Sequence, residues 1–206
     1  MITVATIYYE STLVPPWSRC YTPIWVDRLY RGVARHYKQP FRFVCLVDKD
    51  DYDFEERVEM QPLKHTKWST ACLQMFAIKA DRLVLFGLDT VIVGALDEIF
   101  NYDGPLAVPR DPYRPRNPCN GVVLCPTRQD IADSNAPSDM AALESFGHDW
   151  LDDLFPSQIL SYKVHMRDSG HEAPPPGARI VYFHGEPKQH TLLLGPQHDW
   201  IAECWK

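Results

Sequence analysis

Four consecutive apolar residues, 83–86, are followed three positions later by a single carboxylate, Asp89. A short apolar run of this kind is typical of a strand that is buried on both faces, as in a parallel sheet. A second, β-branched run, residues 90–93, leaves from the carboxylate. Ligands of open α/β sheets bind beyond the carboxyl ends of the strands. We therefore expect Asp89 to serve a ligand rather than the core.

The first half of the chain alternates between strand and helix patterns. Apolar residues recur at helical spacing between residues 26 and 37, and Ser69 or Thr70 is placed to cap a second helix that extends to Lys79. Apolar runs that predict strands lie before, between and after these helices, at residues 2–8, 41–47, 58–60 and 83–86. This alternation predicts an α/β domain with a mainly parallel central sheet and flanking helices.

The second half has fewer regular patterns. Three short strands are predicted, at residues 106–108, 122–124 and 180–183, and a short helix at residues 139–146. Long polar and proline-rich segments separate them. Long ordered loops in a compact domain usually carry function, so we expect this half to contribute to a binding site.

Length and composition predict one globular domain. Of the 206 residues, 45% are hydrophobic and 23% charged, which is the usual balance of a soluble protein with a buried core. The net charge of −6 gives no general attraction to nucleic acid or to an anionic membrane. No apolar stretch approaches the ~20 residues of a membrane helix, so no membrane span is expected.

The N-terminus and the cysteines predict a cytoplasmic protein. Residues 1–7 lack the basic region of a signal peptide and predict a first strand instead. The six cysteines are scattered without a Cys-x-x-Cys pair, which disfavours zinc binding and favours reduced thiols. A disulfide between Cys119 and Cys125 is the alternative, and the expected compartment disfavours it.

A second group of polar residues follows the last predicted strand. His184 comes directly after it, Gly185 allows a close backbone approach, and Lys188 adds a compact cation. Carboxylate and imidazole suit Mg²⁺ or Mn²⁺, and an ammonium suits phosphate oxygens. Taken alone, Asp89 also fits a solvated turn and His184 an ordinary surface residue. Their combination is what predicts a metal and diphosphate site.

Together these segments resemble nucleotide-sugar glycosyltransferases of the A-type (GT-A) fold, especially family 8-like enzymes and their small bacterial and phage relatives. In those enzymes a strand ends in Asp-x-Asp, and a later His-x-x-Gly-x-x-Lys-like segment completes the metal and diphosphate site. Residues 27–33, 40–45 and 102–105 also match, so the resemblance spans most of the chain in order. It implies one GT-A domain over residues 1–206, with a nucleotide-binding half at 1–100 and a donor-sugar and acceptor half at 101–206.

The resemblance implies roles for matching positions in the donor site. Asp89 and His184 would bind Mn²⁺ or Mg²⁺, and Lys188, after Gly185, would contact the diphosphate. Leu88 belongs to the same nucleotide-binding set. The base would be bordered by the residues that end the first strand: Ile7, Tyr8 and Tyr9.

The resemblance also implies residues near the donor sugar. Asn120 matches the segment beneath that sugar, where an amide binds hydroxyls, and Arg110 and Asp111 precede it. Asp149 matches a Gly-Asp-Gln-like element whose acid faces the donor sugar or the acceptor. His148 at the aligned position and a solvated acidic turn are the two alternatives.

Tryptophans are the remaining candidates for sugar contacts. Trp17 and Trp150 lie in loop-like segments and are candidates for stacking on an acceptor sugar. Trp25 and Trp68 are instead predicted to pack in the core or between helix and sheet.

The leading hypothesis is a metal-dependent glycosyltransferase. It would move a sugar from a nucleoside-diphosphate sugar, UDP-linked by the resemblance, to an acceptor that is a glycan, lipid, protein or nucleic acid. The chain departs from the family pattern at Gly87, which replaces the first acid of Asp-x-Asp. It also departs in the helix region before it, residues 68–73, which lacks the basic residue that usually faces the donor, and Lys67 is only nearby. Gly87 favours the alternative, a non-catalytic nucleotide-sugar-binding or scaffold protein on the same fold. A nucleotidyltransferase is disfavoured, because residues 8–12 contain no glycine for a phosphate loop.

Overall fold

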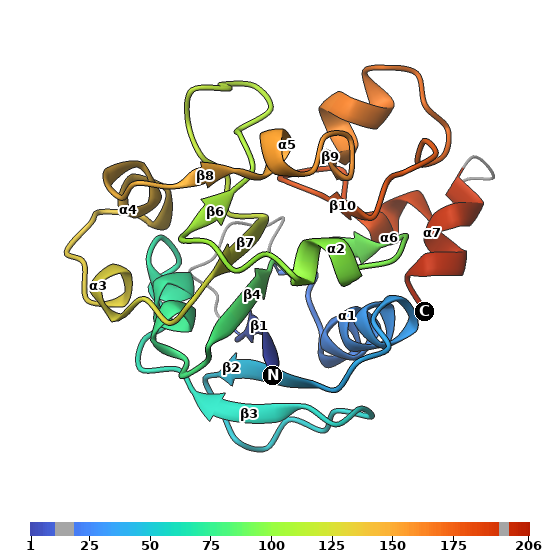
Figure 1. Cartoon of the computed structure of the whole chain (residues 1–206). Coiled ribbons are helices and arrows are strands. Elements are labelled where there is room, and N and C mark those ends of the chain that lie inside the picture. Colours follow the sequence, from blue (N-terminus) through green and yellow to red (C-terminus); the bar gives the residue numbers. More distant parts are fainter. Residues whose placement is uncertain (11–18, 194–197) are drawn as a thin grey trace.

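The protein has two sheets with helices packed around them (Figure 1). The structure is a computed structural model that describes residues 1–10, 19–193 and 198–206. Its strands are β1 (Ile2–Tyr8), β2 (Phe41–Val47), β3 (Glu59–Pro62), β4 (Arg82–Phe86), β5 (Thr90–Ile92), β6 (Ala107–Val108), β7 (Val122–Cys125), β8 (Asp149–Trp150), β9 (Ile159–Ser161) and β10 (Ile180–Tyr182). Its helices are α1 (Pro23–His36), α2 (Asp97–Phe100), α3 (Gln129–Ala132), α4 (Asp139–Ser145), α5 (Leu151–Leu154), α6 (Gln189–Leu192) and α7 (Asp199–Cys204), with a 3₁₀ helix η2 (Ala71–Ala77) and a π-helix η3 (Tyr162–Arg167).

The larger sheet confirms the predicted mainly parallel topology. Its seven strands lie in the order β3-β2-β1-β4-β7-β6-β8. The first four pair in parallel, β7 is antiparallel to β4 and β6, and β8 returns parallel to β6. The chain passes from β1 to β2 and β3 on one side, and only then crosses to β4 on the other. The strand order therefore reverses between β1 and β4.

Each face of this sheet has its own apolar core. In β1, Val4 and Tyr8 belong to the cluster that contains α1, whereas Ala5 belongs to the cluster that contains η2, α3 and α4. This alternation follows the two-residue period of a strand. Figure 1 shows α1 on one side of the sheet and α3 and α4 on the other. Both faces are covered, which explains why nearly every residue of β1 and β4 is buried.

The smaller sheet joins the two halves of the chain. Its order is β5-β10-β9, with β10 antiparallel to β5, so that Tyr182 pairs with Thr90. The backbone N–H of Phe183 continues this pairing and donates to the carbonyl of Asp89 at 2.9 Å. The residues that follow β10 are therefore held beside those that precede β5.

Several elements differ from the sequence predictions. The helix predicted from Ser69 or Thr70 to Lys79 is the shorter 3₁₀ helix η2, without a side-chain cap, and it ends where Ile78 becomes extended and buried. The strands β8 and β9 lie in segments that carry no strand pattern. They form because Asp149 pairs with Ala107 and Ile159 pairs with Ile180, which are distant in sequence. No helix in the described ranges has the length and apolar character needed to cross a bilayer.

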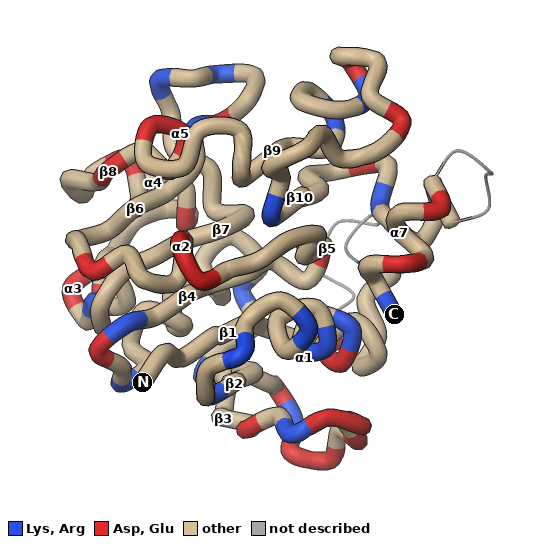
Figure 2. Tube along the Cα trace, turned by 45° about the vertical axis from the view of Figure 1, so that its right-hand side comes forward, with Lys and Arg blue, Asp and Glu red and all other residues tan. Residues whose placement is uncertain are grey.

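Acidic residues gather in the segment after β2, beside the basic residues of α1 (Figure 2). Arg31 binds Glu55 at 2.5 Å and Glu56 at 2.6 Å. The buried carboxylate of Asp27 accepts the backbone N–H of Glu56 at 3.0 Å, and burial raises the pKa of Asp27. The end of this acidic segment is therefore bound to α1.

Helix α4 begins at an N-cap that the structure makes testable. The Ser138 hydroxyl accepts the backbone N–H of Ala141 at 3.2 Å. Ser138→Ala is expected to lower the free energy of unfolding by about 1 kcal/mol, the usual cost of a lost cap. Ser138→Asp keeps an acceptor and is expected to retain stability. Urea denaturation of the three proteins measures this, and equal midpoints for wild type and Ser138→Ala would contradict it.

Candidate functional site

A cavity of about 530 Å³ opens at the carboxyl ends of β1 and β4. This is the point where the strand order reverses, which is where open α/β sheets bind ligands. Its lining comes from the ends of both strands, from η2, from the segment before β7, from the start of α4 and from the segment after β10. The cavity therefore combines residues from both halves of the chain.

All predicted site residues except Asp149 line this cavity. They are Ile7, Tyr8, Tyr9, Leu88, Asp89, Asn120, His184, Gly185 and Lys188. The structure thus brings these residues together. The individual roles that the resemblance implies for them stay predictions.

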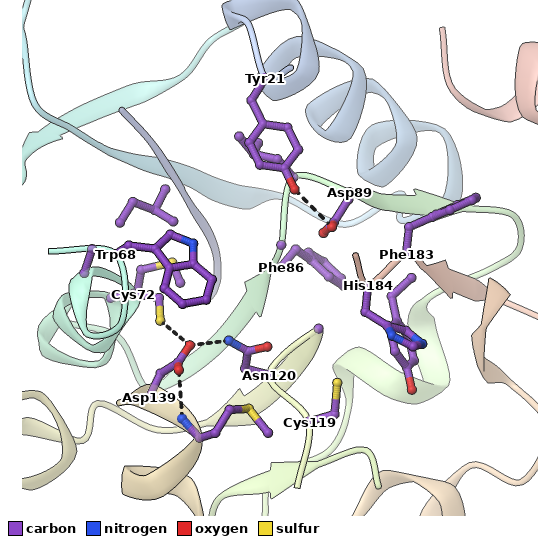
Figure 3. Close-up of a pocket in the computed structure, with 18 of the residues that line it drawn as sticks. Tyr21, Trp68, Cys72, Phe86, Asp89, Cys119, Asn120, Asp139, Phe183 and His184 are labelled. Carbon is purple, nitrogen blue, oxygen red and sulfur yellow. Dashed lines mark hydrogen bonds between the residues drawn. The ribbon is translucent and has the colours of Figure 1, made fainter. Parts of the chain in front are cut away.

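Asp89 is held by two donors at one end of the cavity. Tyr21, just before α1, donates its hydroxyl to Asp89 Oδ2 at 3.0 Å, and Figure 3 shows the two side chains pointing toward one another. The ammonium of Lys188 forms an ion pair with the same oxygen. Burial, and then the charge of Asp89, raise the pKa of Tyr21 well above its ordinary value, so the phenol stays protonated and donates. Lys188 is itself only 3% exposed.

His184 faces the cavity from the turn after β10. Its Nε2 lies 2.8 Å from the hydroxyl of Ser161, which ends β9. Burial, and then the charge of Lys163, lower the pKa of His184, so the imidazole is neutral at pH 7. Gly185 adopts φ +61°, and a Cβ there would lie 3.1 Å from Lys163 Nζ. Glycine therefore permits both the left-handed turn and the approach of this lysine.

A second carboxylate, Asp139, lies in the cavity away from Asp89 (Figure 3). Its Oδ2 accepts from Asn120 Nδ2 at 2.5 Å and from Cys72 Sγ at 2.9 Å, and its Oδ1 accepts from the backbone N–H of Met140 at 2.8 Å. Burial is the main cause that raises the pKa of Cys72, so its thiol stays protonated and donates. Sequence reasoning placed Asp139 only at the start of a helix, where acids are common for structural reasons.

Asp149, predicted as an acid near the donor sugar, does not reach the cavity. It lies in β8, is exposed, and accepts the hydroxyl of Tyr102 at 2.8 Å. Arg110 and Asp111 also stay outside: Arg110 pairs with Asp153, and Asp111 accepts backbone N–H groups of its own loop. The pairing of β8 with β6 places Asp149 outside the cavity, whereas Asp139 is a carboxylate that lines it beside Asn120.

The tryptophans that are buried and those that line the cavity differ from the prediction. Trp25 is buried, as expected, but Trp68 is 50% exposed and lines the cavity, so its prediction as a core residue is wrong. Trp68 lies beside Cys72 in Figure 3. Trp150 packs against Arg110 and lies outside the cavity, and Trp17 lies outside the described residues.

The cavity supplies a poor ligand set for a divalent cation. Within the described ranges, no three His, Cys, Asp or Glu side chains lie together as a potential metal site. Asp89 binds Lys188 and Tyr21, and His184 Nε2 is engaged by Ser161. Both contacts of Asp89 fall on Oδ2, so among the described residues a cation here would have Oδ1 of one carboxylate, beside an ammonium. The residues present therefore do not fit a resident Mn²⁺ or Mg²⁺ ion.

Cys119 and Cys125 are both free thiols, as predicted. Cys119 lines the cavity, whereas Cys125 lies in the core on the η2 side of the sheet. Burial raises the pKa of each thiol to about 12, so both are unreactive at neutral pH.

Sequence comparisons identify no relative, since neither a family model nor a curated protein matches this chain. Solved structures do match. The galactosyltransferase LgtC, in complex with donor and acceptor sugar analogs, superposes with TM-score 0.63 over 97% of this chain and 94% of its own, at 8% identity. The glycosyltransferase GlyE of Streptococcus pneumoniae TIGR4 matches with TM-score 0.64 and 14% identity, over 97% of this chain and 59% of its own.

A third match is the bifunctional glycosyltransferase WbbM, in its apo form. It superposes with TM-score 0.60 and 11% identity, over 98% of this chain and 51% of its own. This chain thus spans nearly all of LgtC but only about half of WbbM and three-fifths of GlyE. At these identities the matches establish the fold, which is that of GT-A glycosyltransferases as the sequence resemblance implied.

Proposed function

We propose that this protein is a glycosyltransferase that uses a nucleoside-diphosphate sugar. One observation carries the proposal: a single cavity at the reversal of the strand order combines a cationic group at one end with an amide and a carboxylate at the other. Lys188 forms the first end, and Asn120 with Asp139 forms the second. Cations suit a diphosphate, and paired amide and carboxylate groups suit sugar hydroxyls.

The nucleotide binds along the end of β1. Ile7, Tyr8 and Tyr9 line this part of the cavity together with Leu88. Burial raises the pKa of Tyr9 to about 12, so it is a neutral phenol with an apolar ring face for a base. These uncharged residues suit a neutral base, and the resemblance favours uracil and therefore UDP as the carrier. The first half of the chain thus holds the nucleotide, as its predicted role requires.

The second half of the chain serves the diphosphate and the sugar. Transfer breaks the bond between the anomeric carbon and the diphosphate oxygen. An acceptor hydroxyl oxygen forms the new bond to that carbon, and its proton passes to the departing diphosphate oxygen. The Lys188 ammonium stabilises the charge that develops on the departing diphosphate. Asn120 and Asp139 hold the hydroxyls of the donor sugar, and the half-exposed ring of Trp68 offers a face for an acceptor sugar.

A second candidate function is a non-catalytic nucleotide-sugar-binding protein on the same fold. It is favoured by Gly87, which leaves one carboxylate where the family pattern has two, and by the engagement of that carboxylate with Lys188. Release of UDP distinguishes the two functions. An enzyme releases UDP from its UDP-sugar, by transfer to an acceptor or to water, and a binding protein does not.

Thermal unfolding with UDP, GDP and CDP tests the proposed site. A nucleotide at ~100 times its Kd adds about 2.7 kcal/mol to the free energy of unfolding, which corresponds to a rise in Tm of about 5–10 °C. We expect this rise with UDP. Asp149→Asn, outside the cavity, is the matched control and should show the same rise. The absence of a shift with all three nucleotides would refute the nucleotide site.

A further inference from the structure

We propose that this chain neutralises the donor diphosphate with Lys188 and Lys163, without a divalent metal ion. The inference rests on the proposed function, because it concerns the same donor site. Such a site would distinguish this chain from the metal-dependent enzymes that its sequence resembles. Nucleotide binding would then be independent of Mn²⁺ and Mg²⁺.

The first argument is the state of Asp89, the residue predicted to bind the metal. Its Oδ2 already accepts from both Lys188 and Tyr21, and Lys188 is almost completely buried. A buried ammonium needs a partner, because an unpaired buried charge is strongly unfavourable. A cation on this oxygen would have to displace that ammonium. Lys188 thus takes the position beside Asp89 that a metal ion would need.

The second argument is the lack of another carboxylate at this end of the cavity. Gly87 stands where the family pattern has its first acid, and a Cβ at this position would lie 2.7 Å from Asp89 Oδ1. The carboxylate of Asp89 therefore occupies the space of a side chain at position 87. Residues 11–18 and 194–197 contain no Asp, Glu, His or Cys, so their sequence offers no replacement ligand.

The third argument is a second ammonium at the same turn. Lys163 Nζ comes close to Gly185, which lines the cavity between His184 and Lys188. Burial, Arg167 and Lys188 all lower the pKa of Lys163, while Glu186 and Asp168 oppose this effect. Lys163 and Lys188 thus repel one another, and an anion bound between them relieves the repulsion. Lys188 lines the cavity itself, whereas Lys163 lies behind this turn, near Glu186, and adds its charge from there.

On binding, the diphosphate lies against Lys188, with the charge of Lys163 behind the turn. Lys188 donates an N–H to a phosphate oxygen in place of Asp89, while Tyr21 continues to donate to Asp89. An ammonium is a compact donor that serves phosphate as a point charge, as it does in other phosphate sites. The charge that a divalent ion would supply therefore comes from two side chains of the protein itself.

Calorimetric titration of the full chain with UDP, GDP and CDP tests this directly, once in excess EDTA and once in excess Mn²⁺. We expect UDP to bind with the same Kd in both, within about threefold. Binding only with Mn²⁺ would overturn the metal-free site and leave the proposed function standing. If no nucleotide binds under either condition, the proposed function fails as well.

A gain-of-metal variant gives an independent test. Gly87→Asp adds the missing carboxylate and displaces that of Asp89 from its present position, and Gly87→Asn adds the same bulk without the charge. Electron paramagnetic resonance of free Mn²⁺, with UDP present, reports bound metal. We expect Mn²⁺ binding in Gly87→Asp, and none in the wild type or in Gly87→Asn. Stoichiometric Mn²⁺ binding by the wild type would contradict the inference.

Discussion

Lys188→Met is expected to weaken UDP binding in EDTA by about 10- to 150-fold, the worth of one hydrogen bond from a charged donor. The variant removes the ammonium that lies against Asp89 and faces the diphosphate site. It also frees the Asp89 carboxylate, so added Mn²⁺ should restore part of the lost affinity. Calorimetric titration with UDP, with and without Mn²⁺, measures both effects.

Three further variants distinguish the loss of the Lys188 charge from a loss of stability. Lys188→Arg keeps the cation and should bind UDP far better than Lys188→Met. Asp89→Asn removes the carboxylate charge but keeps a side-chain oxygen that accepts from the ammonium, so binding in EDTA should persist, whereas a metal site built on Asp89 would lose all affinity. The double variant Asp89→Asn/Lys188→Met removes the unpaired carboxylate and should regain stability without regaining affinity. UDP affinity in Lys188→Met equal to that of the wild type would refute the role of this lysine.

Asp139→Asn is expected to lower the rate of UDP release from a UDP-sugar by about 10- to 100-fold. The carboxylate lies in the cavity, and the amide that replaces it keeps the shape but loses the negative charge that strengthens hydrogen bonds to hydroxyls. Affinity for UDP itself should not change, because Asp139 lies away from the nucleotide end. Coupled detection of UDP from UDP-glucose and UDP-galactose, with water as acceptor, measures the rate.

Asp149→Asn is the matched control for this experiment. Asp149 is exposed and bonded to Tyr102 outside the cavity, so its variant should release UDP at the wild-type rate. A loss of rate in Asp149→Asn but not in Asp139→Asn would show that the resemblance identified the acid correctly and that the cavity did not. Equal loss in both would indicate that β8 positions the sugar end of the site.

Local patterns identified the donor end of the site because its residues follow strands. The apolar runs of β1 and β4 mark buried parallel strands, and the residues after such strands meet at one edge of the sheet. Asp89 could therefore be selected from the sequence pattern, whereas Ile7, Tyr8 and Tyr9 were implied by the family resemblance. His184 and Lys188 needed the family resemblance as well, because a short strand such as β10 does not reveal its partner.

The sugar end was harder to predict because loops and short elements build it. Asp139 and Asp149 are both acids in the same long polar region, and both begin or precede a short element. Local sequence does not distinguish them. The pairing of β8 with β6 turns Asp149 outward, and the Asn120 and Cys72 side chains bind Asp139 inside the cavity.

The sequence by itself determined the fold class, the parallel core and the edge of the sheet at which the cavity opens, because strand periodicity and burial are encoded over a few neighbouring residues. Tertiary structure alone decided which carboxylate enters the cavity and which cation accompanies Asp89. Both depend on contacts between segments that are far apart in the chain, such as Lys188 with Asp89 and Asn120 with Asp139. No local pattern records such contacts, because they arise only when the sheet order brings the two halves together.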